Sequence, residues 1–223
     1  MRSARWILTA VAALTSVTAL AAPPATAAPA DPDPVIFVHG WNGGAWNWND
    51  MVSDFKAAGY ADDRLIAWDY DHTQSNKTTA EELSTLVGET LAATGAEKVD
   101  IITHSMGGLN SRWYLKFLGG TAKVDDWVSI GGPNHGTEVA GLCFDTSCEE
   151  MRVGSEFLGR LNEGDETPDG TNYGTWWSTC DGVINPADST VVDGASNTRT
   201  GCINHLALLT DDGVSQQVRD FVA

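Results

Sequence analysis

Short apolar runs alternate with amphipathic stretches along the chain after about residue 30. The runs are rich in β-branched residues and most are followed by glycine or polar turns, which is typical of buried β-strands. We expect strands at 35–38, 65–68, 99–103, 124–130 and 173–179, with a weaker sixth at 195–200.

The stretches between these runs place apolar residues near a period of 3.6. Residues 79–94 carry Leu83, Val87 and Leu91 on one face and end before Gly95. Further helices are expected at 46–60, 109–118, 205–209 and 214–222. Because strands and helices alternate, the pattern predicts an α/β fold with a mostly parallel central sheet and helices on both faces.

The alternation breaks at residues 141–172, which are rich in glycine, acidic and polar residues. One helical patch is expected within them, at 151–161. We interpret this segment as a surface excursion of one domain and not as a second domain. Its composition is equally consistent with a segment that partly covers a site and with one that only lies at an edge of the fold.

The first 30 residues follow a different pattern. Arg2 and Arg5 form a short positive region, residues 6–20 are mostly apolar, and the A-T-A sequence at 25–27 fits a small-x-small cleavage site. These features predict a secretory signal peptide over 1–28 and a single domain over 29–223. A mature chain of roughly 195 residues is long enough for one domain with a full core.

The formal net charge is −17, and loss of Arg2 and Arg5 with the signal peptide makes it −19. Because the phosphates of a nucleic acid would repel such an acidic protein, we expect no nucleic-acid partner. No other apolar run approaches the ~20 residues of a membrane helix, so we expect no stable membrane insertion. The sequence therefore predicts a secreted, extracellular protein, and we expect a monomer.

Four cysteines follow the signal peptide, and an even number in a secreted protein predicts two disulfides. Cys143 and Cys148 can close a small local loop, which leaves Cys180 to pair with Cys202. Metal binding is the alternative, but the chain has no C-x-x-C motif and no histidine pair at helical spacing. We therefore expect disulfides and no metal site.

The sequence T-H-S-M-G at 103–107 joins an expected strand to the expected helix at 109–118. A serine at the tip of such a strand–turn–helix elbow exposes its hydroxyl above the sheet edge, where a histidine can deprotonate it. The elbow requires small flanking residues, and Gly107 meets this need while Thr103 meets it only in part. The alternative is that Ser105 serves only as a helix N-cap.

Chain order favours His205 as the general base that such a serine needs. It is the last of the five histidines and follows the last expected strand. We expect His104 to be a packing residue, His39 to hold a glycine loop and His72 to be solvated. His135 follows a strand end near the site but precedes any suitable acid.

The acid that orients the histidine should lie between Ser105 and His205 in the chain. We choose Asp181 because it comes shortly after the fifth expected strand. Asp188 and Asp193 remain rivals. Cys180 precedes Asp181 and Cys202 lies three residues before His205. A disulfide between these cysteines would join the acid loop to the histidine loop, which is consistent with the choice.

A tetrahedral oxyanion needs two aimed N–H donors. We expect one from the backbone of Met106, directly after the serine, and one from the backbone of Trp41. Trp41 lies in the glycine-rich loop at 39–44, which lacks the lysine and the spacing of a phosphate-binding loop. No cofactor is expected.

Five segments together resemble the lipase class 2 family, the small secreted bacterial lipases with a minimal α/β-hydrolase fold. They lie at 34–40, 98–108, 128–132, 193–195 and 204–209. The resemblance implies an α/β-hydrolase fold, and it assigns the nucleophile to Ser105, the acid to Asp181 and the base to His205. It also assigns the oxyanion donors to Trp41 and Met106. The excursion, the four cysteines and the many tryptophans depart from the family pattern.

These features predict a secreted serine esterase or lipase that hydrolyses acylglycerol or shorter acyl esters through an acyl-enzyme. A polyester- or cutin-type esterase is an alternative that differs only in the openness of the pocket. A non-catalytic binding module with the same fold is the remaining alternative, because a fold alone does not give a function.

Overall fold

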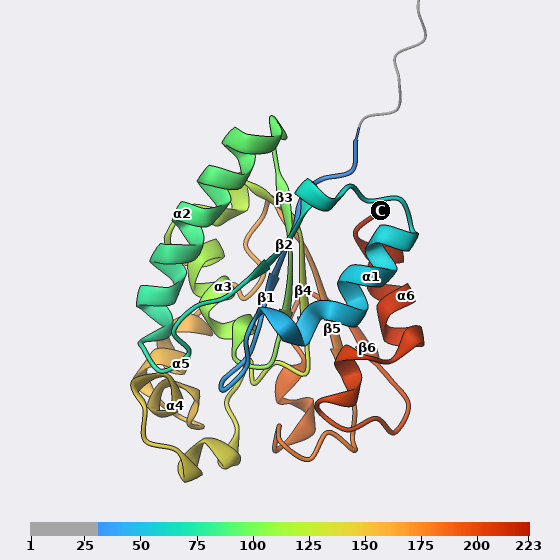
Figure 1. Ribbon diagram of the computed structural model, residues 1–223. Helices are drawn as coiled ribbons and strands as arrows, with labels where there is room; N and C mark the ends of the chain where they lie inside the picture. Colours follow the sequence, from blue (N-terminus) through green and yellow to red (C-terminus); the bar gives the residue numbers. More distant parts are fainter. Residues whose placement is uncertain (1–30) are drawn as a thin grey trace, which may run out of the picture. The chain divides into compact units, whose positions relative to one another are not determined.

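One six-stranded sheet runs through the centre of the computed structural model, which describes residues 31–223 (Figure 1). All paired strands are parallel, in the order β2-β1-β3-β4-β5-β6. The strands are β1 (Val35–Val38), β2 (Leu65–Trp68), β3 (Val99–His104), β4 (Val124–Ile130), β5 (Asn172–Trp177) and β6 (Ser196–Arg199). The α/β class expected from the sequence is confirmed.

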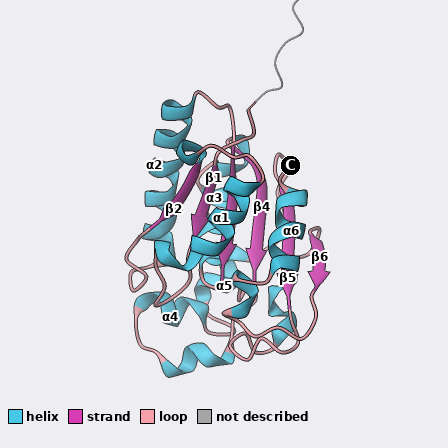
Figure 2. Cartoon of the chain, turned by 45° about the vertical axis from the view of Figure 1, so that its right-hand side comes forward, coloured by secondary structure: helices cyan, strands magenta, loops and turns pink. Residues whose placement is uncertain are grey.

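Helices cover both faces of the sheet (Figure 1). One face carries α1 (Asn49–Ala57) and α6 (Asp212–Phe221), and the other carries α2 (Asn76–Thr94) and α3 (Gly107–Phe117). The shorter helices α4 (Thr146–Met151) and α5 (Glu156–Leu161) join α3 in a third apolar cluster, near the carboxyl ends of the strands (Figure 2). None of the helices described in 31–223 is long and apolar enough to cross a membrane.

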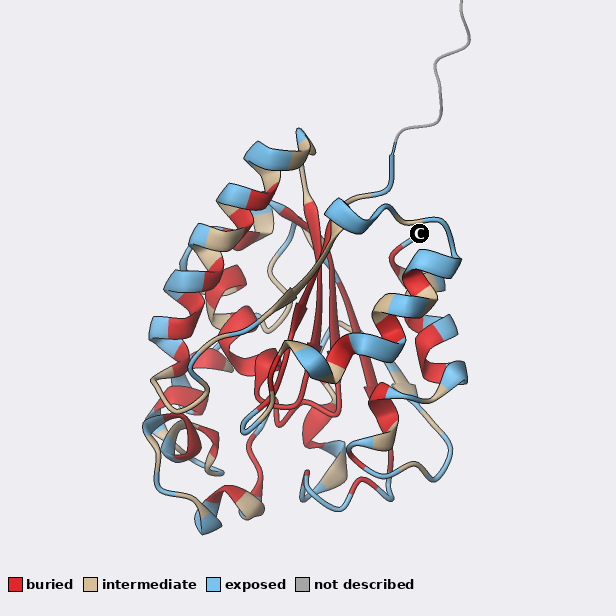
Figure 3. Ribbon diagram, in the orientation of Figure 1, coloured by how far each residue is buried: buried red, intermediate tan, exposed pale blue. Residues whose placement is uncertain are grey.

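The continuous apolar run of β1 results from burial on both faces. Val35 and Phe37 belong to the cluster under α1 and α6, whereas Ile36 and Val38 belong to the cluster under α2 and α3. The inner strands are buried throughout most of their length (Figure 3). The edge strand β6 is mostly exposed, which explains why its sequence signal is the weakest of the six.

Several expected helix boundaries are wrong, for local reasons. α2 begins at Asn76, three residues before its apolar pattern, because the side chain of Ser75 accepts a hydrogen bond from Lys77 N and caps the helix. The helix expected at 46–60 is a 3-10 turn followed by the shorter α1. The 3-10 turns are η1 (Ala45–Trp48), η2 (Asp62–Arg64), η3 (Gly120–Ala122), η4 (Glu138–Leu142), η5 (Ala187–Thr190) and η6 (Ala207–Leu209).

The helix expected at 205–209 is only the 3-10 turn η6. The helical patch expected at 151–161 is correct only in its second half, where α5 lies, because its first residue ends a separate helix, α4. α4 ends at Met151, Gly154 adopts a positive φ of 77°, and Ser155 then caps α5 by accepting a hydrogen bond from Leu158 N. The predicted signal peptide lies outside the described residues.

A carboxyl group is buried near the amino end of β3. The side chain of Asp100 is almost fully buried, and its Oδ1 accepts a hydrogen bond of 3.2 Å from Asp126 N. Its Oδ2 has no hydrogen-bond partner in the described part of the chain. Burial, assisted by the nearby carboxylates of Asp126 and Asp33, raises the pKa of Asp100 to about 8.

We predict that Asp100→Asn stabilises the protein increasingly as the pH rises. The folded wild type holds a proton on Asp100 that the unfolded chain has lost, so its stability falls between about pH 4 and about pH 8. The difference in Tm between the variant and the wild type should widen over this range by roughly 3 °C or more. Calorimetry at several pH values measures it, with the exposed Asp63→Asn as a control. A difference that stays constant with pH would contradict the argument.

Candidate active site

Ser105 lies at a strained turn between β3 and α3. Its φ of 54° is in the left-handed region, which non-glycine residues rarely adopt and which is typical of a nucleophile elbow. Backbone hydrogen bonds hold the turn, since Ser105 N donates to Ile130 O and Gly108 N donates to Ser105 O, each at 3.0 Å. The Ser105 side chain faces a cavity at the carboxyl edge of the sheet.

The elbow packs so closely on the end of β1 that two glycines are required. A Cβ atom at Gly107 would lie 2.5 Å from Val38 O and 2.8 Å from His39 O. A Cβ atom at Gly40 would lie 2.6 Å from the Cβ of Ser105. Both positions therefore exclude a side chain unless the elbow moves.

The elbow accommodates the side chain of Thr103 at a position where a glycine is more common. Its side chain is fully buried, and its hydroxyl donates a 2.7 Å hydrogen bond to Val128 O on β4. The polar group is thereby satisfied within the sheet. This contact explains how the T-x-S-x-G sequence replaces the more common pattern with two glycines.

Asp181 and His205 form a buried hydrogen-bonded pair. His205 Nδ1–H donates to Asp181 Oδ2 at 2.8 Å, and both side chains are less than a tenth exposed. With the proton on Nδ1, the lone pair of Nε2 remains available to accept a proton. The other carboxylate oxygen, Asp181 Oδ1, accepts from Val183 N at 2.9 Å and from Ile184 N at 2.7 Å.

The surroundings of Asp181 favour its ionised form. Burial alone raises the pKa of the carboxyl. The hydrogen bond from His205, the charge of His205 when protonated, and the two backbone N–H donors together outweigh burial and leave the pKa below its ordinary value. The pair therefore places a carboxylate, and not a neutral acid, behind the imidazole.

The loops that carry Asp181 and His205 are joined covalently and by hydrogen bonds. The disulfide Cys180–Cys202 links them, as the cysteine spacing predicts, and His205 N donates to Asp181 O at 2.9 Å. Ser178 Oγ accepts from both Cys180 N and Ile203 N. These contacts fix the acid loop against the histidine loop.

His104 packs against His205 from the other side, at 4.4 Å between ring centroids. Its Nε2–H donates a 3.0 Å hydrogen bond to the backbone oxygen of His205. Burial, reinforced by the charge of His205, lowers the pKa of His104 to about 3, so its ring stays neutral. The sequence predicts only packing here, because no local signal links residues 101 positions apart.

His39 holds the glycine loop, as expected. Its Nδ1–H donates to Gly40 O at 2.8 Å, and Tyr70 donates its hydroxyl to His39 O at 2.6 Å. The two rings stack at 4.1 Å. Burial lowers the pKa of His39, which keeps the ring neutral in this position.

A cavity of about 510 Å³ opens above Ser105 and His205. Trp41 and its neighbours in the glycine loop line one side. Another side is lined by Thr137, Val139 and Ala140, directly before the excursion, and by Leu142, Cys143 and Met151 of the excursion itself. The excursion therefore borders the site through its first part, up to α4, whereas residues 152–172 do not reach the cavity.

The two expected oxyanion donors have free backbone N–H groups. In residues 31–223 no hydrogen bond engages Trp41 N or Met106 N. Met106 lies in the elbow itself, with its side chain buried in the apolar cluster that α3 shares with α4 and α5. Within the same range no hydrogen bond joins Ser105 Oγ to His205, but both side chains line the same cavity.

The rival residues serve elsewhere. Asp188 lies in the first turn of η5, and the backbone N of Asp193 donates to Glu166. Glu166 also pairs with His135 at 2.8 Å, and neither lines the cavity. His72 is only partly exposed: its Nδ1 is buried, and its ring centroid lies 5.9 Å from that of Trp41. Among residues 31–223 no cluster of three His, Cys, Asp or Glu could hold a metal ion.

The family model described as "Lipase (class 2)" matches residues 32–222. The chain belongs to the lipase class 2 family. A triacylglycerol lipase of Burkholderia plantarii is 32% identical over 155 residues, which are 65% of this chain and 43% of that protein. One of Pseudarthrobacter phenanthrenivorans is 32% identical over 118 residues, or 50% of this chain and 36% of that protein. The chain thus spans less than half the length of these relatives.

Solved lipases share the fold. The mature form of Bacillus licheniformis lipase BlEst2 superposes with a TM-score of 0.75 at 20% identity, covering 90% of this chain and 96% of that one. Aspergillus fumigatus lipase B gives a TM-score of 0.70 at 22% identity, covering 80% of this chain and 49% of that one. The fold of this class 2 lipase family member is the α/β-hydrolase fold expected from its sequence.

We predict that Gly107→Ala lowers stability by about 1–3 kcal/mol, because the added methyl group meets two backbone oxygens. Gly88→Ala, in the middle of α2 where a Cβ meets nothing within 4 Å, is the matched control. It should raise stability by about 0.5–1 kcal/mol. Urea unfolding measures both. Equal effects of the two variants would show that the elbow has room for a side chain.

Proposed function

We propose that this protein is a secreted serine esterase of the lipase type, which hydrolyses carboxylic esters through an acyl-enzyme. The observation that carries the proposal is the buried hydrogen bond from His205 to Asp181, because His205 lines the same cavity as Ser105. A hydroxyl on a strained elbow, a neutral imidazole with a free nitrogen, and an ionised acid are the parts that ester hydrolysis requires.

In the acylation step, Ser105 Oγ attacks the ester carbonyl while His205 Nε2 removes its proton. The resulting oxyanion is stabilised by the backbone N–H groups of Trp41 and Met106. His205 then gives the proton to the leaving alcohol, and Asp181 stabilises the imidazolium that forms in between.

In the deacylation step, water takes the place of the alcohol. His205 removes a proton from the water, the hydroxide adds to the acyl carbonyl, and the same two N–H groups stabilise the second oxyanion. Collapse releases the acid and returns the proton to Ser105. The disulfide between the acid and histidine loops supports both steps by holding the base in one orientation.

Apolar side chains at the mouth of the cavity favour acylglycerols or other acyl esters as substrates. Trp46, Leu142 and Leu206 line the cavity, yet 66%, 81% and 64% of their surfaces remain exposed. Exposed apolar side chains gathered at one opening are typical of a surface that contacts an apolar ligand. An acyl chain would cover them when it enters the cavity.

Two disulfides, with no free cysteine in residues 31–223, support the proposal of secretion. Disulfides persist mainly in oxidising compartments such as the extracellular space. The class 2 family relationship and the predicted signal peptide favour the same location.

The test is hydrolysis of p-nitrophenyl esters from acetyl to palmitoyl by the wild type and by Ser105→Ala. We expect kcat/KM to fall by at least about 10³-fold in the variant with every ester. Ser84→Ala, on the outer part of α2, is the matched control and should keep full activity. The chain-length profile of the wild type separates a lipase from a short-chain esterase. Turnover that survives in Ser105→Ala would refute the proposal.

A further inference from the structure

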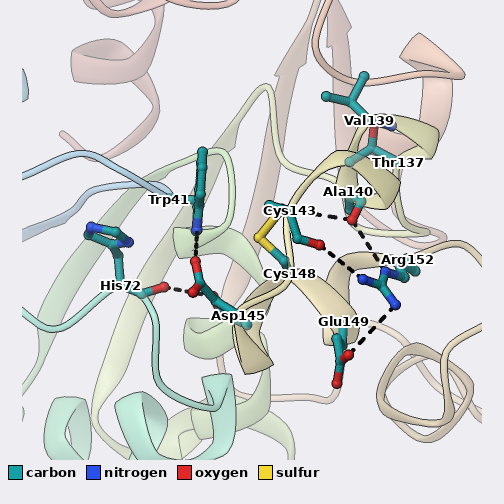
Figure 4. The surroundings of a disulfide bond; sticks show 11 residues. Trp41, His72, Thr137, Val139, Ala140, Cys143, Asp145, Cys148, Glu149 and Arg152 are labelled. Carbon is teal, nitrogen blue, oxygen red and sulfur yellow. Dashed lines mark hydrogen bonds and ion pairs between the residues drawn. A yellow bond between two sulfur atoms is a disulfide. The ribbon is translucent and has the colours of Figure 1, made fainter.

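A hydrogen bond connects Trp41, which lines the cavity, to Asp145 of the excursion (Figure 4). The indole Nε1–H of Trp41 donates to Asp145 Oδ2 at 3.0 Å. The two residues are 104 positions apart in the chain. Because the acceptor is a carboxylate, the hydrogen bond is charge-assisted and stronger than one between neutral groups.

The short loop that carries Asp145 is held in place at both ends. The disulfide Cys143–Cys148 closes it into a ring. Arg152 donates from Nη2 to Cys143 O at 2.9 Å and from Nε to Ala140 O at 3.3 Å (Figure 4). The carboxylate of Asp145 is thus presented to Trp41 by a cross-linked segment.

The ring is also anchored to the body of the fold through α4. Glu150 accepts hydrogen bonds from Ser75 Oγ and from both Asn76 N and Asn76 Nδ2, at the start of α2. Ser147 Oγ donates to His72 O at 2.7 Å. The ring of His72 in turn lies nearly perpendicular to the indole of Trp41, at 5.9 Å between ring centroids. The indole of Trp41, which is 39% exposed, therefore contacts this one assembly twice, through its N–H group and through the ring of His72.

Trp41 needs such an anchor because the backbone around it is strained. The next residue, Asn42, has a φ of 56° in the left-handed region. Within the loop, one backbone hydrogen bond, from Gly43 N to Gly40 O at 3.2 Å, closes the turn. A strained turn persists only when the surrounding contacts determine it.

We propose that Asp145 is a positioning residue for ester hydrolysis, which holds Trp41 so that its backbone N–H points at the oxyanion. The inference rests on the function proposed above. The excursion is then part of the catalytic machinery through one side chain, and the Cys143–Cys148 ring keeps that side chain in place. A donor aimed at the oxyanion acts mainly in the transition state, so its displacement lowers kcat more than it raises KM.

The test uses p-nitrophenyl acetate, whose short acyl group makes little use of the apolar wall of the excursion. Asp145→Ala should lower kcat by about tenfold while KM changes by less than about twofold. Trp41→Phe keeps an aromatic ring but loses the N–H donor, and it should give a similar loss. The double variant should be no worse than either single variant, because both remove the same hydrogen bond.

Two further variants separate positioning from general damage to the loop. Asp145→Asn keeps an oxygen acceptor and should restore most of kcat. Glu156→Gln removes a charge from the exposed start of α5 in the same excursion, away from the Asp145 loop, and it should leave kcat unchanged. Thermal unfolding of each variant verifies that the fold is intact.

An unchanged kcat in Asp145→Ala would overturn the inference, as would additive losses in the double variant. The same variants are also assayed with p-nitrophenyl palmitate, and a rise in KM confined to this long-chain ester would overturn the inference, because it would mean that Asp145 only borders the acyl site. These outcomes differ from the one that would refute the proposed function, which is turnover that survives in Ser105→Ala. An inactive Ser105→Ala with a fully active Asp145→Ala would refute only the positioning role.

Discussion

A serine at a φ of 54° between β3 and α3 forces the start of the helix against the end of β1. That close approach explains why no side chain fits at Gly107 or at Gly40, whose Cβ would meet Ser105 itself. It also brings the glycine loop after β1 to the serine. The strained turn at one residue thus brings the proposed nucleophile close to the loop that carries one proposed oxyanion donor.

Parallel strands bring the other parts of the site to the same edge of the sheet. Gly131 follows β4, and a Cβ there would lie 3.1 Å from Asp181 Oδ2 and 3.3 Å from His205 Nδ1. The acid and the histidine therefore pack on the backbone beside the elbow. His104, the residue before the serine, then bonds the backbone of His205. Strand ends, elbow and histidine loop form one connected structure.

The sequence predicts the inner strands, the order of the site residues and the disulfides, because each depends on the pattern of neighbouring residues. The inner strands are evident because burial on both faces leaves continuous apolar runs such as Val35–Val38. The chain order of Ser105, Asp181 and His205 follows from the topology that these strands imply. The disulfides follow from cysteine spacing, because only one pairing leaves a short local loop.

Contacts between distant segments are beyond such patterns. The bond from His104 to His205 and the bond from Trp41 to Asp145 join residues more than 100 positions apart. Neither pair carries a motif. The break between α4 and α5 is also missed, because apolar residues keep a helical spacing across it while Ser155 starts a new helix. Tertiary packing, and not local preference, decides these features.

Labelling with an alkyl phosphonate tests the central claim most directly, because the reaction requires a serine activated by its neighbours. Peptide mapping should find one adduct, on Ser105, after incubation of the folded protein with the probe. His205→Ala should react far more slowly, and the wild type unfolded in urea should not react. An unlabelled Ser105, or an adduct on another residue, would contradict the account.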